Sequence, residues 1–472
     1  MTLNDILTAI NNFMYTYPLL ILLIGADIYF TIRTRFVQVR LLKNSFSVIG
    51  EKPQGSISTK EVSSFQALMI STASRVGTGN IAGIATAIAT GGPGAVFWMW
   101  IMALLGGASA FIESTLAQVY KTKDGNEFRG GPSYYMEKAL GKRWMGILFS
   151  ILLIICFAYG FNGLQAFNIS SAFSYYIPNY EHSIFPVIVG LILALATAFV
   201  IFGGVHRIGF ISSVIVPIMA ITYLFIGFFV VIFNLTELPH VIAIIFKGAF
   251  DFQAILGGLA GSAVVTGIKR GLFSNEAGMG SAPNASASAS VSHPAKQGLV
   301  QVLSVFIDTF LICTTTAMIL LFSGVEGQAG KLDGIPFVQT AISTNIGNWG
   351  IHFITFSIFA FAFSSVVGNY YYAESNILFI KNNKTILLIF RITCLLAVFF
   401  GAQADFSMIW NIADITMGLM ATVNIIAILL LGNIAVKVLK DYEKQLKTRK
   451  NPTFYPKDLG IENTECWDLE EV

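Results

Sequence analysis

Residues 71–80 read STASRVGTGN and lie inside a long apolar stretch of the chain. A second apolar stretch carries a comparable irregularity, GLFSNEAGMGSAP, at residues 271–283. Glycines, polar side chains and a charge stand near the middle of both stretches, where a simple membrane anchor would be uninterrupted. Because backbone groups cannot stay unpaired in lipid, irregular backbone at this depth must face protein or a watery cavity. The two stretches therefore predict two broken membrane helices.

The composition excludes a water-soluble protein. Of the 472 residues 55% are hydrophobic and only 12% are charged, whereas a soluble domain has about a quarter charged residues. The 43 glycines agree with this, since glycine is more frequent in membrane helices than in soluble ones. The four cysteines form no C-x-x-C pair, so neither a disulfide framework nor a metal site is expected.

Eleven runs are long and apolar enough to cross a bilayer, which requires about 20 residues of helix. We also expect two shorter amphipathic helices, at residues 240–250 and 336–345, to lie on the outer face. The eleven runs occupy residues 6–32, 65–90, 94–120, 144–173, 184–204, 209–234, 254–290, 297–324, 350–380, 385–403 and 408–436.

The positive charges of the loops give the orientation of these helices. Nearly all Lys and Arg residues of the loops, including Lys52 and Lys60, fall on one side, and the other side has only Lys247 and Lys331. Cytoplasmic loops are rich in Lys and Arg. We therefore expect the amino terminus outside and the carboxyl tail in the cytoplasm, with the polar tail partly disordered.

The two broken helices begin two groups of five helices with opposite orientation. Broken helices at matching positions of inverted halves indicate a transporter binding site, although a glycine-rich patch alone can be a packing surface. The predicted organisation is an amino-terminal helix and loop (1–64), a first five-helix repeat (65–234), an external connection (235–253), a second repeat (254–440) and a cytoplasmic tail (441–472).

Helix ends at the breaks suit small charged ligands. The amino terminus of a half-helix binds a carboxylate, and unwound carbonyls with nearby hydroxyls can bind a hard cation such as sodium. The chain has no P-loop and no H-E-x-x-H motif, so we expect a secondary transporter and not an enzyme or an ATP-driven pump. A channel, an intramembrane enzyme and a proton-driven carrier of the same fold remain the competing classes.

The chain resembles the alanine or glycine:cation symporters, also called sodium:alanine symporters, in residues 71–94 (STASRVGTGNIAGIATAIATGGPG), 129–136 (RGGPSYYM) and 271–286 (GLFSNEAGMGSAPNAS). The resemblance implies a LeuT-like fold in a bacterial inner membrane and sodium-coupled uptake of a small neutral amino acid, alanine or glycine. Glutamine, another solute or proton coupling are the alternatives. Sodium is the expected coupling ion; no other cofactor and no nucleic acid is expected.

The resemblance also assigns residues to the site. Residues 76–80 (VGTGN) match the unwound segment of the fold's first core helix, where the amides of Thr78 and Gly79 would bind the substrate carboxylate. The sodium ligands implied are the carbonyls of Ala73, Val76 and Phe361 and the hydroxyls of Ser364 and Ser365. The substrate would be lined by Asn80, Phe273, Ser274, Glu276, Gly278 and Met279, with Gln165 and Asn369 toward its ammonium group.

Charged residues inside the membrane helices need a reason, because each is costly there. Arg75 stands where relatives of the fold have a small residue, beside a second sodium site; its guanidinium either replaces that sodium or pairs with a buried acid. Glu276 would serve the substrate ammonium or Arg75. Lys269 and Arg270 would be ion-pair partners or part of a gate. We expect a structural role for Glu113, Asp308 and Glu374, and we expect the helix of Asp414 to line the cavity.

Overall fold

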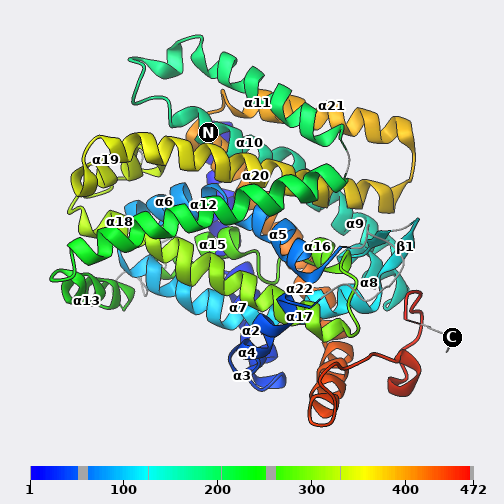
Figure 1. Cartoon of the computed structure of the whole chain (residues 1–472). Helices are drawn as coiled ribbons and strands as arrows, with labels where there is room; N and C mark the ends of the chain where they lie inside the picture. Colours follow the sequence, from blue (N-terminus) through cyan, green and yellow to red (C-terminus); the bar gives the residue numbers. More distant parts are fainter. Residues whose placement is uncertain are drawn as a thin grey trace.

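The computed structural model describes residues 2–51, 62–125, 127–203, 205–250, 262–329 and 331–467. Within these ranges the protein is almost entirely helical (Figure 1). Some of the predictions lie outside the described residues: the start of the seventh span at 254–261, the loop residues Lys52 and Lys60, and residues 468–472 of the tail.

In the described residues the helices and one β-hairpin follow one another along the chain. They are α1 (Leu3–Thr16), α2 (Pro18–Arg33), α3 (Val37–Arg40), α4 (Leu42–Ile49), α5 (Ser64–Arg75), η1 (Gly79–Gly83), α6 (Ile84–Gly91), α7 (Gly94–Val119), β1 (Thr122–Asp124), β2 (Glu127–Arg129), α8 (Pro132–Lys138), α9 (Arg143–Leu153), η2 (Ile154–Phe161), α10 (Asn162–Ser171), η3 (Tyr180–His182), α11 (Phe185–Ile201), α12 (Val205–Phe233), α13 (Leu238–Ala249), α15 (Ala263–Asn275), α16 (Pro283–Ala287), α17 (Pro294–Phe306), η4 (Ile307–Cys313), α18 (Thr314–Phe322), α19 (Gly334–Ile346), α20 (Trp349–Ile380), α21 (Lys384–Gly401), α22 (Phe406–Leu446) and η5 (Pro456–Leu459).

Eight helical stretches in the described part of the chain are long and apolar enough to span a membrane. The helix that follows η3, α11, is shorter at 17 residues. The remaining two predicted spans are each divided: α5 and α6 are separated by residues 76–83, and α15 and α16 by residues 276–282. Both broken helices are confirmed, whereas the total of eleven spans stays a prediction.

The broken helices lie at the centre of the bundle. Helix α7 packs against α15 and α17, while α20 packs against α5, α10 and α12 (Figure 1). At the periphery, large apolar side chains such as Phe199 on α11 and Phe233 on α12 are exposed by 71% and 76%. Exposed apolar surface of this extent is stable only against lipid. The polar breaks are thus enclosed by helices that themselves face the bilayer.

The first predicted span is one stretch with a bend. It consists of α1 and α2, and Tyr17 between them leaves the helical region with φ −121° and ψ −79°. Pro18 causes the bend, because proline has no N–H to donate and its ring clashes with the preceding turn. The bend directs α1 against α22.

The carboxyl tail differs from the prediction of partial disorder up to residue 467. Helix α22 continues to Leu446, and the segment after it folds back on the bundle beside α8 (Figure 1). Trp467 and Phe454 are 7% and 3% exposed, and the Trp467 indole donates to the Gln118 carbonyl at 2.9 Å. The prediction of disorder rested on the polar composition of the tail and did not take account of these two buried aromatic residues.

Candidate functional site

The break after α5, here called the first break, is formed by backbone that leaves the helix at Val76 with ψ 89°. A methyl group on Gly77 would lie 2.2 Å from Ser365 Oγ and 3.1 Å from the Gln165 side chain. No Cβ fits at such a distance, so glycine is required here by close approach and not by an unusual φ. The first break is therefore pressed directly against α20 and α10.

The five predicted sodium ligands meet at this point. The Ser365 hydroxyl lies 3.0 Å from the Ala73 carbonyl, 3.3 Å from the Val76 carbonyl and 3.0 Å from the Phe361 carbonyl. Ser364 donates to the same Phe361 carbonyl at 2.8 Å. Because α5 ends at Arg75, the carbonyls of Ala73 and Val76 belong to its free carboxyl-terminal turn. The result is a buried cluster of five oxygen atoms from two helices.

The predicted substrate residues of the first break also lie together. Thr78 donates its amide to Gln165 Oε1 at 3.1 Å, and Gly77 donates to Asn80 Oδ1 at 3.0 Å. The Asn80 amide in turn donates to Ser274 Oγ at 3.1 Å. The buried hydroxyl of Thr78 has no hydrogen-bond partner in the described part of the chain.

An aromatic wall covers the first break. A methyl group on Gly79 would lie 3.0 Å from the Phe273 ring. The Phe273 ring packs edge-on against Phe161 at 4.8 Å and against Trp410 at 5.3 Å between centroids. The three rings come from α15, η2 and α22, so the wall depends on the relative positions of three elements.

In the break after α15, here called the second break, backbone amides donate hydrogen bonds to a side chain of the protein. Three residues have positive φ: Glu276 (54°), Gly278 (77°) and Gly280 (86°). The amides of Gly278 and Gly280 donate to the Glu113 carboxylate at 3.3 and 3.0 Å. Asn424 donates to Glu113 at 2.8 Å and to the Gly278 carbonyl at 2.9 Å. Gly278 therefore faces Glu113 and not the first break.

Two predicted ammonium ligands are bonded within the protein. Glu276 accepts from Ser74 at 2.9 Å and from Ser281 at 2.5 Å. Asn369 accepts from the same Ser74 hydroxyl at 2.8 Å and donates to the Asn162 side chain at 3.0 Å. Both side chains therefore hydrogen-bond to Ser74 of α5, next to the first break. The neighbouring Met279 is fully buried.

Arg75 lies within electrostatic range of the buried acids Glu113, Glu276 and Asp308 but forms no direct ion pair with them. Its Nη1 donates to Gln301 at 2.9 Å, and its Nε and Nη2 have no hydrogen-bond partner in the part of the chain that the structure describes. Among the described residues no ion pair within 4.0 Å joins Arg75 to Glu276, although the charge of Arg75 acts on Glu276 through space. Both alternatives given for Glu276, the substrate ammonium and Arg75, stay predictions. The position of Arg75, one residue before the first break, could be read from the sequence. Its hydrogen-bond partner Gln301 could not.

Asp308, for which a structural role is expected, accepts from Asn80 and Ser274, each at 2.7 Å. Sequence reasoning did not foresee that these polar contacts place Asp308 beside the first break. Its position within an apolar run was the available signal. The structural role expected for Glu374 is confirmed by its ion pair with Arg391 at 3.2 Å. Lys269 and Arg270 are ion-pair partners of Asp414.

Comparisons with known proteins agree with this architecture. The amino-acid carrier protein AlsT of Bacillus subtilis is 51% identical over 469 residues, which cover 99% of this chain and 98% of AlsT. The probable sodium/glutamine symporter GlnT of the same organism is 47% identical and covers 100% of this chain and 97% of its own.

The crystal structure of MhsT in complex with L-phenylalanine superposes with a TM-score of 0.53 at 13% identity, covering 83% of this chain and 99% of MhsT. That likeness confirms the predicted LeuT-like fold. The model of the sodium:alanine symporter family matches residues 1–456. The chain belongs to the sodium:alanine symporter family, whose members couple sodium to the transport of amino acids.

Proposed function

We propose that this protein carries alanine or glycine into the cell together with sodium, by alternating access in the bacterial inner membrane. Membership of the family supports sodium-coupled amino-acid symport. The relatives differ in the substrate that their names print, since one is an amino-acid carrier and another a probable glutamine symporter. The choice of a small substrate therefore rests on the geometry of the first break.

The oxygen cluster around Ser365 is the observation that carries the sodium assignment. Three carbonyls lie within 3.3 Å of one hydroxyl, and a second hydroxyl lies 2.8 Å from one of them. Hard cations prefer such oxygen ligands. The carbonyls at the end of α5 also carry the negative end of its dipole. A sodium ion would join α5 to α20 and so connect ion binding to the position of the first break.

The amides at the first break are the proposed site of the substrate carboxylate. Thr78 and Gly79 lie where the chain enters η1, so their N–H groups belong to a helix amino terminus. The carboxylate would exchange with Gln165 at the Thr78 amide, leaving Gln165 for the ammonium group. Phe273 lies against Gly79, so its ring would border a substrate bound there and limit the substrate side chain to a hydrogen or a methyl group. This contact favours glycine and alanine.

The Arg75 guanidinium is proposed to act as a fixed positive charge in place of a second sodium ion. It is 2% exposed and its two remaining nitrogen atoms have no hydrogen-bond partner among the described residues. One sodium would then accompany each substrate molecule. A measured ratio of two sodium ions per alanine would contradict this proposal.

The proposed topology follows the charge of the loops. The amino terminus and the start of α22 would lie outside, and the tail in the cytoplasm. Two inverted repeats, residues 65–234 and 254–440, would each begin with one of the broken helices. Helices α1 and α2 precede this pair.

The test is uptake of labelled alanine into proteoliposomes, with and without an inward sodium gradient. Sodium-driven uptake that glycine inhibits supports the proposal. Uptake that follows a proton gradient alone contradicts the sodium site. Inhibition by glutamine as strong as by glycine contradicts the small pocket.

Ser365→Ala tests the oxygen cluster directly. Because it removes the hydroxyl that touches three carbonyls, we expect the sodium concentration at half-maximal uptake to rise by about tenfold. The order of preference among amino acids should not change. Ser357→Ala is the matched control, since Ser357 is a buried serine of the same helix. An unchanged sodium dependence in Ser365→Ala would remove this residue from the site.

A further inference from the structure

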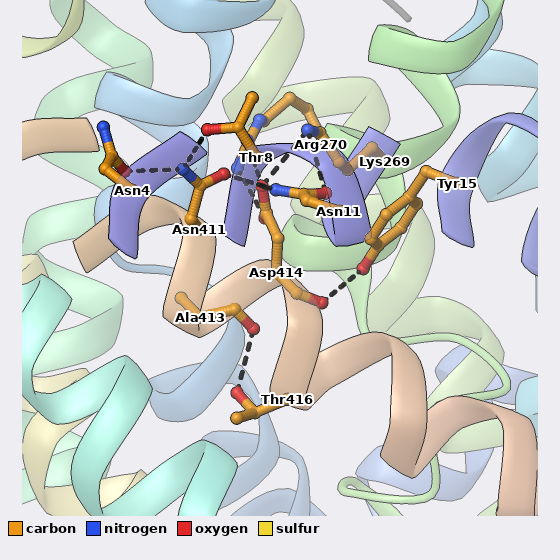
Figure 2. A network of polar contacts seen from close by, with 10 residues as sticks. All are labelled: Asn4, Thr8, Asn11, Tyr15, Lys269, Arg270, Asn411, Ala413, Asp414 and Thr416. Carbon is orange, nitrogen blue, oxygen red and sulfur yellow. Dashed lines mark hydrogen bonds and ion pairs between the residues drawn. The ribbon is translucent and has the colours of Figure 1, made fainter. Parts of the chain in front are cut away.

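Helix α1 presents one polar face to α22. Its polar residues recur every three or four positions and so share a face. Figure 2 shows this face turned toward α22, where the Asn411 amide donates to Thr8 at 2.9 Å and to Asn4 at 3.1 Å. Asn11 and Tyr15 are each only 2% exposed. The face consists of Asn4, Thr8, Asn11 and Tyr15.

Asp414 stands at the centre of these contacts. Arg270 forms two bonds to its carboxylate at 3.1 and 2.7 Å, and Lys269 approaches it to 3.2 Å (Figure 2). From α1, Asn11 donates to the carboxylate at 3.2 Å and Tyr15 donates to the Asp414 carbonyl at 2.9 Å. A single buried acid on α22 therefore binds two cations of α15 and two side chains of α1.

Asn11 bonds to both sides of this ion pair. Its Nδ2 donates to Asp414, and its Oδ1 accepts from Lys269 at 3.5 Å. A neutral amide suits this place, because it offers a donor to the anion and an acceptor to a cation. Helix α1 is thus hydrogen-bonded to α22 and α15 together.

A continuous series of contacts leads from this cluster to the first break. The Arg270 guanidinium lies 4.2 Å from the centre of the Trp410 ring. Trp410 packs on Phe273, which lies against Gly79. Trp410 is also 6.2 Å from Phe406, which lines a cavity of about 730 Å³ at the end of the bundle where α22 begins. Trp410 therefore neighbours both a residue that lines that cavity and the ring that covers the first break.

We propose that α1 is a latch on the outer side of the transport site, with Asn11 and Tyr15 as its positioning residues. They hold Asp414 and Arg270 together and so keep Trp410 and Phe273 over the first break. The sidedness of this proposal rests on the function and topology proposed above. Helices α1 and α2 precede the two proposed repeats, so the latch is an addition to the ten helices that would move against one another.

The energetics of the cluster support a latch. Opening toward the cavity requires α15 and α22 to separate, and separating a buried ion pair leaves uncompensated charges. Helix α1 opposes that separation, because Asn11 and Tyr15 donate to Asp414 of α22. On the α15 side, Lys269 donates to Asn11 and lies 5.4 Å from the centre of the Tyr15 ring. A contact that favours the closed state alone shifts the equilibrium between closed and open forms by its own free energy.

Cys313 provides a native reporter of outward opening. It is 3% exposed, and its sulfur lies 3.2 Å from the Asn80 amide and 3.1 Å from the Ser274 hydroxyl at the first break. A membrane-impermeant methanethiosulfonate reagent added outside reaches this thiol only when the site opens outward. The other three cysteines (Cys156, Cys394 and Cys466) would be replaced by serine in the background protein.

Asn11→Leu and Tyr15→Phe are the test variants in the full-length protein. We expect each to raise the rate of Cys313 modification by about fivefold, the effect of losing about one buried hydrogen bond. Asn12→Leu is the matched control, because Asn12 is the next residue of α1 and is exposed. In an Asp414→Asn background the effect of Asn11→Leu should be smaller, because a neutral acceptor replaces the charged one. The bond from Asn11 to Asn411 at 2.8 Å is present in both backgrounds.

Two results would overturn the latch. One is a rate of Cys313 modification in both α1 variants equal to that of the wild type. The other is an effect of Asn11→Leu that persists unchanged in Asp414→Asn. If the double variant fails to fold, the rate of Cys313 modification in Tyr15→Phe tests the latch by itself, because this variant removes only a hydroxyl. Labelling needs neither sodium nor alanine, so a failure of alanine uptake would contradict the proposed function and leave this result standing.

Discussion

The breaks after α5 and α15 leave similar backbone groups without helical partners, and the protein satisfies them in different ways. At the second break the amides of Gly278 and Gly280 are bound by the carboxylate of Glu113. At the first break the carbonyls of Ala73 and Val76 meet only the hydroxyl of Ser365 among the hydrogen bonds of the described residues. At the second break a carboxylate binds the backbone amides. At the first break the carbonyls contact a neutral hydroxyl, so they can still bind a cation.

This difference supports the proposal that the first break binds ligands and that the second is structural. The Glu113 carboxylate accepts three N–H bonds and so occupies the amides of Gly278 and Gly280. Carbonyls touched by one hydroxyl retain lone pairs for a cation, since a carbonyl oxygen has two. Two irregular segments that look alike in the sequence therefore satisfy their backbone groups in different ways.

The largest effect is expected where the first break has no free space. Gly77→Ala would place a methyl group 2.2 Å from Ser365 Oγ, which displaces the hydroxyl at the centre of the oxygen cluster. A shift of this size should reduce sodium-driven alanine uptake by about 100-fold. Gly25→Ala is the control, because a methyl group there meets nothing within 4 Å. Uptake near the wild-type level in Gly77→Ala would contradict the importance of the contact.

A change at the second break should affect stability more than sodium binding. Glu113→Gln replaces a carboxylate that accepts three N–H bonds by an amide with a single acceptor oxygen. An unsatisfied buried donor costs about 1–3 kcal/mol, so the apparent Tm in detergent should fall by about 5 °C. Glu137→Gln, at a partly exposed residue, is the control. If sodium affinity fell instead and Tm stayed constant, the two breaks would not differ in the way described.

The smallest effect should come from the edge of the oxygen cluster. Among the described residues Ser364 hydrogen-bonds only to the Phe361 carbonyl, at 2.8 Å, whereas Ser365 lies against three carbonyls. We therefore expect Ser364→Ala to raise the sodium concentration for half-maximal uptake by about threefold, less than Ser365→Ala does. Sodium titration of alanine uptake in both variants measures the ratio. The reverse order would move the centre of the site toward Ser364.

The site was predictable to the extent that its residues belong to local patterns. The glycines and polar residues at 76–80 disrupt an apolar run, and that disruption is visible without a structure. The resemblance supplied Ser364 and Ser365, and the structure brings both beside the first break. Gly278, Glu276 and Asn369 were placed in the substrate site by the same resemblance, but in this conformation they bond to Glu113, Ser74 and Asn162.

By itself the sequence determined the membrane environment, the two breaks and the family, because these follow from composition and from contiguous motifs. Only the tertiary structure decided which buried charge serves which group: Glu113 binds amides 165 and 167 residues away, and Asp414 joins α1 to α15. The physical reason is that a buried polar group must find its partner within hydrogen-bonding distance. That distance is set by how helices pack and not by their separation along the chain.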